Sequence, residues 1–281
     1  MGKFNGVLIA SDFDNTMVFS EGSLRSHAPI PPVSAENREA VEYFMGEGGI
    51  FSVATGRALP SFEQVRPGIP MNGPTILFNG AAIYDFTAGR YLHTAFLPES
   101  VRGHVKELLQ AMPGLTIEVY HDDNSIQAIN PSRLTASHQH LTHAPTQPIA
   151  SIDDAPSPLS KLLFEEEGDR LAQLLDLLHS CPWSNAYEIV PSSSFLVELT
   201  IKGANKGGAA KKLAELLHIG HEHVYCVGDH ANDVPMLQFA HIAFAPENAI
   251  EPVKKLPGIR ILPHCSENAI AEMIRQLDEI Y

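Results

Sequence analysis

The sequence predicts an α/β protein, built on a doubly wound parallel sheet of the Rossmann-like kind with a second α+β unit inserted into it. Near both ends of the chain, short apolar runs alternate with amphipathic helical segments, as in parallel sheets with helices on both faces. The middle of the chain lacks this alternation. At 281 residues the chain is long enough for two domains of ordinary size.

The core is expected to comprise residues 1–84 and 194–281. Its strands are expected near residues 7–11, 50–54, 75–79, 223–228, 241–245 and 259–262. Its helices are expected over residues 34–46, 205–218, 232–240 and 266–280. Ser34 is a suitable N-cap for the first of these helices, and Gly48 with Gly49 ends it.

Residues 85–193 are expected to form an inserted cap. Helices are predicted over residues 98–112 and 169–180, and strands over 115–120, 125–129 and 161–164, with a further strand pair ending near Val190. The segment 121–124 is typical of a hairpin turn. Residues 131–158 are rich in proline and are expected to form a long loop with at most one short helix. Trp183 is expected to pack within the cap and not to serve as a substrate platform.

Two carboxylates and a hydroxyl follow the first apolar run, at Asp12, Asp14 and Thr16. Because side chains alternate along a strand, Asp12 and Asp14 should leave it on the same side, at the carboxyl end where open α/β sheets bind ligands. Two acids together repel each other and lose hydration, which a chain tolerates when a cation neutralises them or when they take part in chemistry. A plain solvated strand end with an Asp helix cap is the alternative.

The later apolar runs end in similar ways. Thr55-Gly56-Arg57 follows the second, where a hydroxyl and free backbone N–H groups can hold phosphate oxygens. Gly228-Asp229-His230-Ala231-Asn232-Asp233 follows a run near residue 224. Lys206 comes directly after Asn205, a predicted helix N-cap, and a cation in the first helical turn is favoured only when an anion lies in front of it.

In this order, these four segments resemble the motifs of the haloacid dehalogenase (HAD) superfamily of phosphoryl-transfer enzymes. Phe78-Asn79-Gly80 and the long insertion are similar to those of Cof-type, sugar-phosphatase-like members with a type IIB cap. Asn15 replaces a frequent glycine, but asparagine tolerates positive φ. His230 replaces a frequent serine, and its role stays open.

The resemblance implies a role for each matching residue. Asp12 would be the nucleophile and Asp14 the general acid and base, with Thr55 and Lys206 completing the catalytic set. Mg²⁺ would be held by Asp12, the Asp14 main-chain carbonyl and Asp229. Phosphate would be bound by Phe13, Thr55, Gly56, Lys206 and Asn232, with support from Thr16, Arg57, Asn79 and Asp233.

The function that the resemblance implies is Mg²⁺-dependent hydrolysis of a small phosphorylated metabolite, a sugar phosphate above all, through an aspartyl phosphate. A phosphotransferase or sugar phosphomutase would share the nucleophile, but it needs a second phosphate site and the cap shows no obvious arginine cluster. A phospho-accepting signalling module of the receiver type is a further alternative, although such modules are shorter and lack a cap.

Composition limits the partners. The formal charge of −14 disfavours nucleic acid. No apolar run reaches the length of a membrane helix, and the N-terminal residues do not read as a secretory signal, so no membrane association is expected. Three widely spaced cysteines indicate a reducing, cytoplasmic location without disulfides. The oligomeric state stays open.

His138, His140 and His143 raise the question of a zinc site. No cysteine or acid lies near them in the sequence, so a polar, histidine-rich loop is the favoured interpretation.

Overall fold

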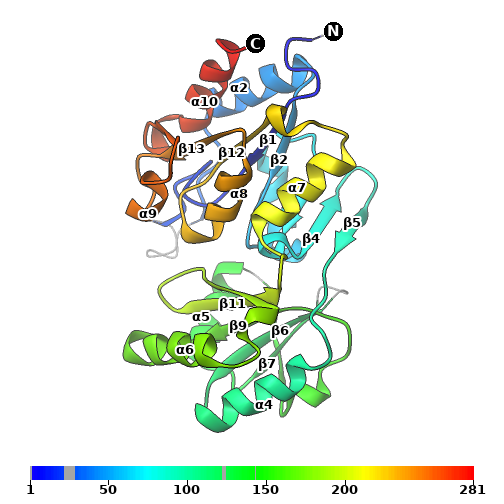
Figure 1. Cartoon of the computed structure of the whole chain (residues 1–281), viewed down its shortest axis with the longest axis vertical. Helices are drawn as coiled ribbons and strands as arrows, with labels where there is room; N and C mark the ends of the chain where they lie inside the picture. Colours follow the sequence, from blue (N-terminus) through cyan, green and yellow to red (C-terminus); the bar gives the residue numbers. More distant parts are fainter. Residues whose placement is uncertain (1, 22–28, 122–124, 143) are drawn as a thin grey trace.

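The computed structural model describes residues 2–21, 29–121, 125–142 and 144–281. Two bodies lie one above the other, and the chain crosses between them twice (Figure 1). The upper body contains a five-stranded, all-parallel sheet with the strand order β14-β13-β12-β1-β2. These strands are β1 Leu8–Ser11, β2 Ile50–Val53, β12 Val224–Val227, β13 Ile242–Pro246 and β14 Arg260–Leu262. The predicted doubly wound α/β core is therefore confirmed.

Helices cover both faces of this sheet because both faces of each strand are apolar. Ile9 and Phe51 pack on one side with α10 (Ala269–Asp278), whereas Leu8 and Ala10 pack on the other with α7 (Lys206–Leu216). Each fully buried aliphatic side chain of this kind contributes about 1.5–3 kcal/mol to stability. The other core helices are α2 Ala35–Gly46, α3 Leu59–Val65, α8 Val234–Phe239 and α9 Glu251–Lys254. The oxygen of Ser34 caps α2 as expected, accepting from the Asn37 N–H at 3.2 Å.

The strand predicted over residues 75–79 is shorter and belongs to another sheet. β3 (Thr75–Leu77) pairs antiparallel with β4 (Ala82–Asp85), which pairs with β5 (Arg90–Thr94). Its link to the parallel sheet is an isolated bridge between Ala54 and Ile76. Residues 78–80 have φ values of 51°, 52° and 106°, a left-handed conformation that ends the strand and turns the chain back.

The lower body is the cap, with a six-stranded sheet of order β10-β11-β9-β6-β7-β8. Its strands are β6 Thr116–His121, β7 Ile126–Ile129, β8 Gln147–Ile149, β9 Leu159–Glu165, β10 Tyr187–Pro191 and β11 Leu196–Ile201. Its helices are α4 Val101–Ala111, α5 Arg133–Thr142 and α6 Gly168–Ser180. The hairpin strands and both long helices were predicted. The segment 131–158 is more regular than predicted, because it contributes β8 to the sheet as well as the short helix α5.

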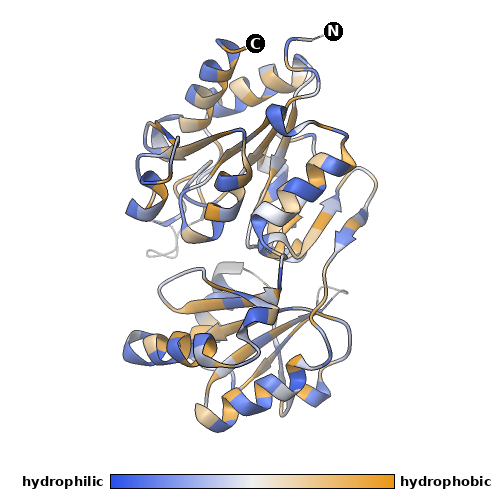
Figure 2. Ribbon diagram, in the orientation of Figure 1, coloured by the Kyte–Doolittle hydropathy of each residue, from blue (hydrophilic) through white to orange (hydrophobic). Residues whose placement is uncertain are grey.

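The two faces of the cap sheet differ. Val119, Leu162 and Val197 point to an apolar cluster that includes residues of α4 and α6. Their neighbours in the strands, such as Tyr120, Lys161 and Glu198, point the other way, toward the core body. Figure 2 shows the apolar residues on the strands and the inner helix faces, with polar residues outside. Trp183 packs in the cap as expected, stacked on His104 at 4.6 Å between ring centroids.

The strand pairings indicate at which residues the core ends and the cap begins. The boundary expected after residue 84 falls inside the β3-β4-β5 sheet. The boundary expected before residue 194 assigns β11 to the core, although β11 pairs with the cap strand β9. We therefore propose a cap of residues 96–201 in place of 85–193. Within the described part of the chain, no helix has the length and apolar content that a membrane crossing requires.

Candidate active site

The carboxyl ends of three neighbouring strands bring the predicted residues together. Because β1 lies between β12 and β2, Asp12 at the end of β1 has Asp229 on one side and Thr55 on the other. Asp12 and Asp229 are each 6% exposed. The three strand ends therefore meet at one edge of the sheet.

The turn after β1 adopts the predicted conformation. Asn15 has a φ of 56°, in the left-handed region that asparagine tolerates. The turn directs the Thr16 hydroxyl into the site, 3.3 Å from Asp12 Oδ2 and 3.1 Å from Asp229 Oδ1. Thr16 therefore lies between two carboxylates and holds them in place.

Lys206 is fully buried in the first turn of α7, where Asn205 caps the helix by accepting from the Gly208 N–H. Its Nζ donates to Asp12 Oδ1 at 2.6 Å and to Asp233 Oδ1 at 2.7 Å. Burial would lower the pKa of Lys206, but the two carboxylates outweigh it and raise that pKa. The predicted anion in front of this helix terminus is thus supplied by two aspartates.

Asp233 is committed to holding other groups. Its Oδ2 accepts from the main-chain N–H groups of Asp229 and His230, at 3.0 and 2.9 Å. A Cβ at Gly228 would lie 2.4 Å from Asp233 Cγ, so this position admits only glycine. Glycine is therefore required at position 228, because the Asp233 carboxylate packs against the end of β12 at this point.

The acidic residues fit a divalent cation. Carboxylate oxygens of Asp12, Asp229 and Asp233 lie within 4.8 Å of one another. Burial, followed by the charge of Asp233, raises the pKa of Asp12 to about 7. Burial and the charge of Asp12 raise the pKa of Asp229 to about 9. The single positive charge of Lys206 does not compensate these three carboxylates. Asp233 is already bonded to Lys206 and to two main-chain N–H groups. Asp12 and Asp229 therefore remain to offer the oxygen ligands that hard cations prefer.

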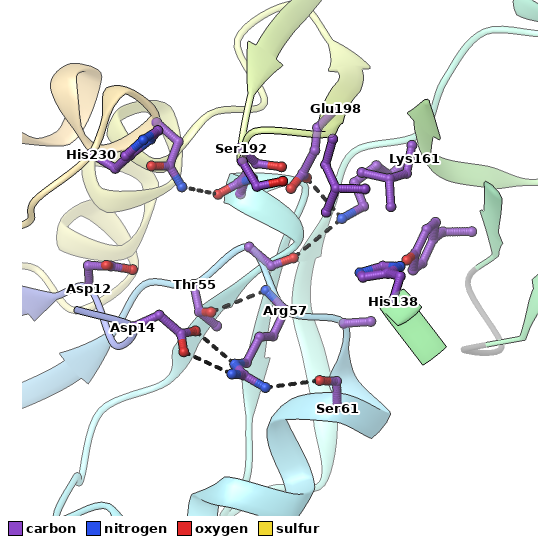
Figure 3. A pocket seen from close by; sticks show the side chains of 18 of the residues that line it. Asp12, Asp14, Thr55, Arg57, Ser61, His138, Lys161, Ser192, Glu198 and His230 are labelled. Carbon is purple, nitrogen blue, oxygen red and sulfur yellow. Dashed lines mark hydrogen bonds and ion pairs between the residues drawn. The ribbon is translucent and has the colours of Figure 1, made fainter. Parts of the chain in front are cut away.

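Asp14 forms an ion pair that sequence reasoning did not anticipate. Its oxygens accept from Arg57 Nε at 2.9 Å and Nη2 at 2.8 Å, and Arg57 also reaches Ser61 Oγ at 3.3 Å (Figure 3). Burial would raise the pKa of Asp14, but Arg57 outweighs it and lowers that pKa. The Arg57 guanidinium lies over the Phe13 ring at 5.6 Å, so the side chain of Phe13 packs, and only its main chain remains for phosphate binding.

The groups expected to bind phosphate lie beside Asp12. Thr55 Oγ1 accepts from the Arg57 N–H at 3.1 Å, and Asn232 Nδ2 donates to Asn79 Oδ1 at 2.9 Å. Asn79 Nδ2 is buried and has no hydrogen-bond partner among the described residues. It lies 3.0 Å from where a Cβ on Gly56 would be. The glycine thus keeps open a space beside an unsatisfied donor, Asn79 Nδ2.

These residues line the floor of a cavity of about 240 Å³ between core and cap. Its roof consists of cap residues, among them Tyr120, His138, Lys161, Ser192 and Glu198. Lys161 Nζ donates to Glu198 Oε2 at 2.9 Å, contacts the core carbonyl of Gly56 at 3.3 Å, and lies 4.6 Å from the Tyr120 ring centroid (Figure 3). A buried charge pair therefore faces the predicted catalytic residues.

Sequence reasoning missed these roof residues. His138 and Ala144, in the segment 131–158 that was expected to be a loop, line the cavity. Residues 122–124 of the expected hairpin turn lie outside the described part of the chain. The signal for Lys161 in the sequence is a lysine directly before the apolar residues 162–164, in the strand β9, where every residue is buried. His230 also lines the cavity, and burial lowers the pKa of its imidazole.

Comparison with known proteins agrees with the resemblance to the haloacid dehalogenase superfamily. A family model described as haloacid dehalogenase-like hydrolase matches residues 9–274. The chain is 26% identical to the 5-amino-6-(5-phospho-D-ribitylamino)uracil phosphatase YwtE of Bacillus subtilis, over 96% of this chain and 97% of that protein. It is 24% identical to the HMP-PP phosphatase of Yersinia enterocolitica, over 95% and 94%. The crystal structure of the HAD subclass IIB sugar phosphatase BT4131 superposes with a TM-score of 0.77 at 20% identity, over 97% and 99%.

Proposed function

Because the chain belongs to the haloacid dehalogenase-like hydrolases and is a Cof-type phosphatase, we propose that it hydrolyses a small sugar or polyol phosphate through an aspartyl phosphate at Asp12. The observation that carries this proposal is the position of Asp12 and Asp14 on the floor of the cavity between core and cap, with Lys206 hydrogen-bonded to Asp12.

In the first step a carboxylate oxygen of Asp12 attacks phosphorus, and the bond from phosphorus to the leaving oxygen breaks. Asp14 gives its proton to that oxygen. In the second step Asp14 takes a proton from water, the water oxygen attacks phosphorus, and the bond to Asp12 breaks to release phosphate. Lys206, Thr55, Gly56 and Asn232 supply fixed donors and positive charge for the phosphoryl oxygens.

Asp14 must hold a proton to act as the acid, yet its ion pair with Arg57 favours the ionised form. We infer that the substrate changes this balance. A phosphate in the cavity competes for the Arg57 guanidinium, which prefers bidentate oxyanion partners. Loss of the pair leaves Asp14 buried with less compensation, and burial then raises its pKa.

The oxygen ligands at Asp12 and Asp229 favour Mg²⁺ as the resident cation. When bound, Mg²⁺ offsets the negative charge of the nucleophile and of the phosphoryl group. The main-chain carbonyl of Asp14 remains a proposed third ligand.

The roof favours a substrate whose leaving group carries hydroxyl groups. Lys161 and Glu198 together offer a donor and an acceptor, Ser192 offers a hydroxyl, and Tyr120 offers a ring face. A buried polar pair discriminates strongly, because a ligand that cannot hydrogen-bond leaves it unsatisfied. Sugar and polyol phosphates meet this requirement, and one relative is named for a phosphoribityl compound.

The roof favours hydrolysis over phosphoryl transfer between two sugar positions. A mutase needs a second phosphate site in the cap. Among the described cap residues that line the cavity, Lys161 is the one lysine or arginine, and it is paired with Glu198.

The test is phosphate release from a panel of sugar, polyol, nucleotide and aryl phosphates with Mg²⁺. We expect multiple turnovers and the highest kcat/KM on a sugar or polyol phosphate. Best activity on a substrate without hydroxyl groups would contradict the proposed substrate class, and the absence of phosphate release from every compound would contradict the proposed hydrolysis.

A further inference from the structure

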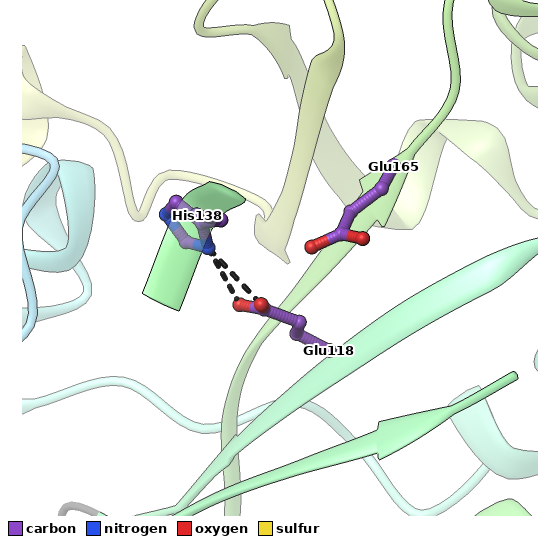
Figure 4. A group of neighbouring side chains, drawn as sticks. All are labelled: Glu118, His138 and Glu165. Carbon is purple, nitrogen blue, oxygen red and sulfur yellow. Dashed lines mark hydrogen bonds and ion pairs between the residues drawn. The ribbon is translucent and has the colours of Figure 1, made fainter. Parts of the chain in front are cut away.

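A second group of metal-ligand side chains lies within the cap. Glu118 in β6, His138 in α5 and Glu165 in β9 each place one ligand atom within 4.8 Å of the others (Figure 4). The sheet register explains why the two glutamates meet. Glu118 pairs with Leu163 and Thr116 pairs with Glu165, so the glutamates are diagonal neighbours on the same face.

The existing contacts leave one of these carboxylates incompletely satisfied. Glu118 accepts from Tyr120 Oη at 2.6 Å and lies 3.0 Å from His138 Nδ1. Glu165 Oε2 accepts from Thr135 Oγ1 at 2.6 Å. Glu165 Oε1 has no hydrogen-bond partner in the described part of the protein, although the residue is only 1% exposed. An unsatisfied buried acceptor of this kind costs about 1–3 kcal/mol.

We propose that Glu118, His138 and Glu165 bind a divalent cation of the zinc class. Two carboxylates and one imidazole are a ligand set that zinc accepts, and three protein ligands leave a further position for water. The charge of the cation would also relieve the repulsion between the two buried carboxylates.

The ligand set distinguishes this site from the catalytic one. Asp12 and Asp229 offer oxygen only, which suits Mg²⁺, whereas an imidazole nitrogen favours zinc and other transition metals. Along the chain no acid lies near His138, so the sequence alone does not indicate zinc. The fold brings acids to it from β6 and β9.

A cation here would fix part of the cavity roof. His138 lines the cavity, and α5 contacts the cap sheet at this point through Glu118 and Glu165. A bound cation would join α5 to two strands at once.

The test is zinc binding by the whole chain in the presence of excess Mg²⁺, which occupies the catalytic site. We expect one zinc per chain, measured by calorimetric titration and by metal analysis after gel filtration. Zinc X-ray absorption should report a mixed nitrogen and oxygen ligand set. Glu165→Gln, which keeps the side-chain shape, should weaken zinc binding by more than about tenfold.

Glu166→Gln is the matched control, because Glu166 is the next residue along the chain and pairs with Arg170 at 2.6 Å, outside the cluster. It should bind zinc as the unmodified chain does, and so should Asp229→Asn, which lacks a catalytic ligand. Should Glu165→Gln fail to fold by circular dichroism, His138→Gln decides in its place. The proposal would be overturned if the unmodified chain did not bind zinc, or if Asp229→Asn lost zinc binding. It would also be overturned if zinc binding were unchanged in the folded Glu165→Gln variant or, where that variant does not fold, in His138→Gln.

Discussion

Asp12, on the floor of the cavity, combines the features that the proposed nucleophile requires. It is held by Lys206 at 2.6 Å and by Thr16 at 3.3 Å, so its orientation is set before substrate arrives. Such positioning removes part of the entropic barrier to attack. An amide at position 12 would keep the size of the side chain and one oxygen acceptor for Lys206, whose charge Asp233 would still compensate.

Asp12→Asn should lower kcat by at least about 10³-fold, because the amide is nearly isosteric but a poor nucleophile. The melting temperature and circular dichroism should stay close to those of the unmodified chain. Asp169→Asn, at an exposed position in α6, is the control and should keep full activity. Substantial residual phosphatase activity in pure Asp12→Asn protein would remove Asp12 from this role.

The raised pKa values of Asp12 and Asp229 make cation binding depend on pH. In the cation-free protein these groups hold protons up to about pH 7 and about pH 9, respectively, whereas the unfolded chain releases them near pH 4. Their contribution to stability is therefore present at low pH and is lost as the pH rises through the folded-state values. A divalent cation bound by these carboxylates, Mg²⁺ in our proposal, would replace these protons and restore the lost stability.

We expect the rise in melting temperature caused by Mg²⁺ to be larger at about pH 8.5 than at about pH 5.5. Scanning fluorimetry across this range checks it. Asp229→Asn should abolish the effect. A Mg²⁺ effect that is independent of pH would show that the carboxylates are already ionised without the cation.

At the scale of elements, the residues that follow the carboxyl ends of β1, β2 and β12 form the floor of the site. Their meeting could be predicted from the sequence, because apolar runs followed by Asp12, Thr55 and Asp229 read as neighbouring parallel strands. The Asp14–Arg57 pair could not, since the side-chain path of Arg57 depends on its packing against Phe13. Nor could the turn at Phe78–Gly80, because two consecutive non-glycine residues with positive φ have no reliable sequence signal.

Side chains alternate along the cap strands β9 and β11, so Lys161 and Glu198 point to the cavity while their neighbours Leu162 and Val197 pack inside the cap. Lys161 and Glu198 are 3% and 6% exposed, so each depends on the other for charge compensation. Removing one partner of such a pair leaves an uncompensated buried charge, which costs about 3–5 kcal/mol. Replacing both by apolar residues costs far less.

Lys161→Met should therefore lower the free energy of unfolding by about 3 kcal/mol or more, and Lys161→Met with Glu198→Leu should recover most of it. If the pair also contacts the leaving group, the double variant should keep hydrolysis of a small aryl phosphate but raise KM for the best sugar or polyol phosphate. Lys202→Met, at a side chain that is 62% exposed, serves as the control. An unchanged order of substrate preference in the double variant would place specificity elsewhere.

At the scale of the whole molecule, the residues proposed to catalyse hydrolysis line the floor and belong to the core. The residues proposed to set specificity line the roof and belong to the cap. The motifs of the floor are near both ends of the sequence, so the core could be predicted from the sequence alone. The roof could not, because Tyr120, His138 and Lys161 reach the cavity only when the polar face of the cap sheet lies over the core. The position of the cap boundaries depends on the pairing of β5 and β11, which short apolar runs do not specify.

Replacing the proposed cap, residues 96–201, by a short linker should preserve the metal and phosphoryl groups of the core. Mg²⁺ binding and weak hydrolysis of an aryl phosphate should remain, whereas discrimination among sugar phosphates should disappear. Calorimetry and the substrate panel measure the two effects separately. A folded, capless core with the full order of preference would show that specificity resides in the core.

The proposed aspartyl phosphate is tested most directly by trapping it in the Asp14→Asn variant. With an aryl phosphate as substrate, a good leaving group needs no proton, so the first step proceeds while the second lacks its base. After a rapid acid quench, mass spectrometry of the peptide that contains Asp12 should show a phosphoryl group on Asp12, accumulating above the level in the unmodified enzyme. Phosphate release from this variant without any modified peptide, or a phosphoryl group on another residue, would contradict the account.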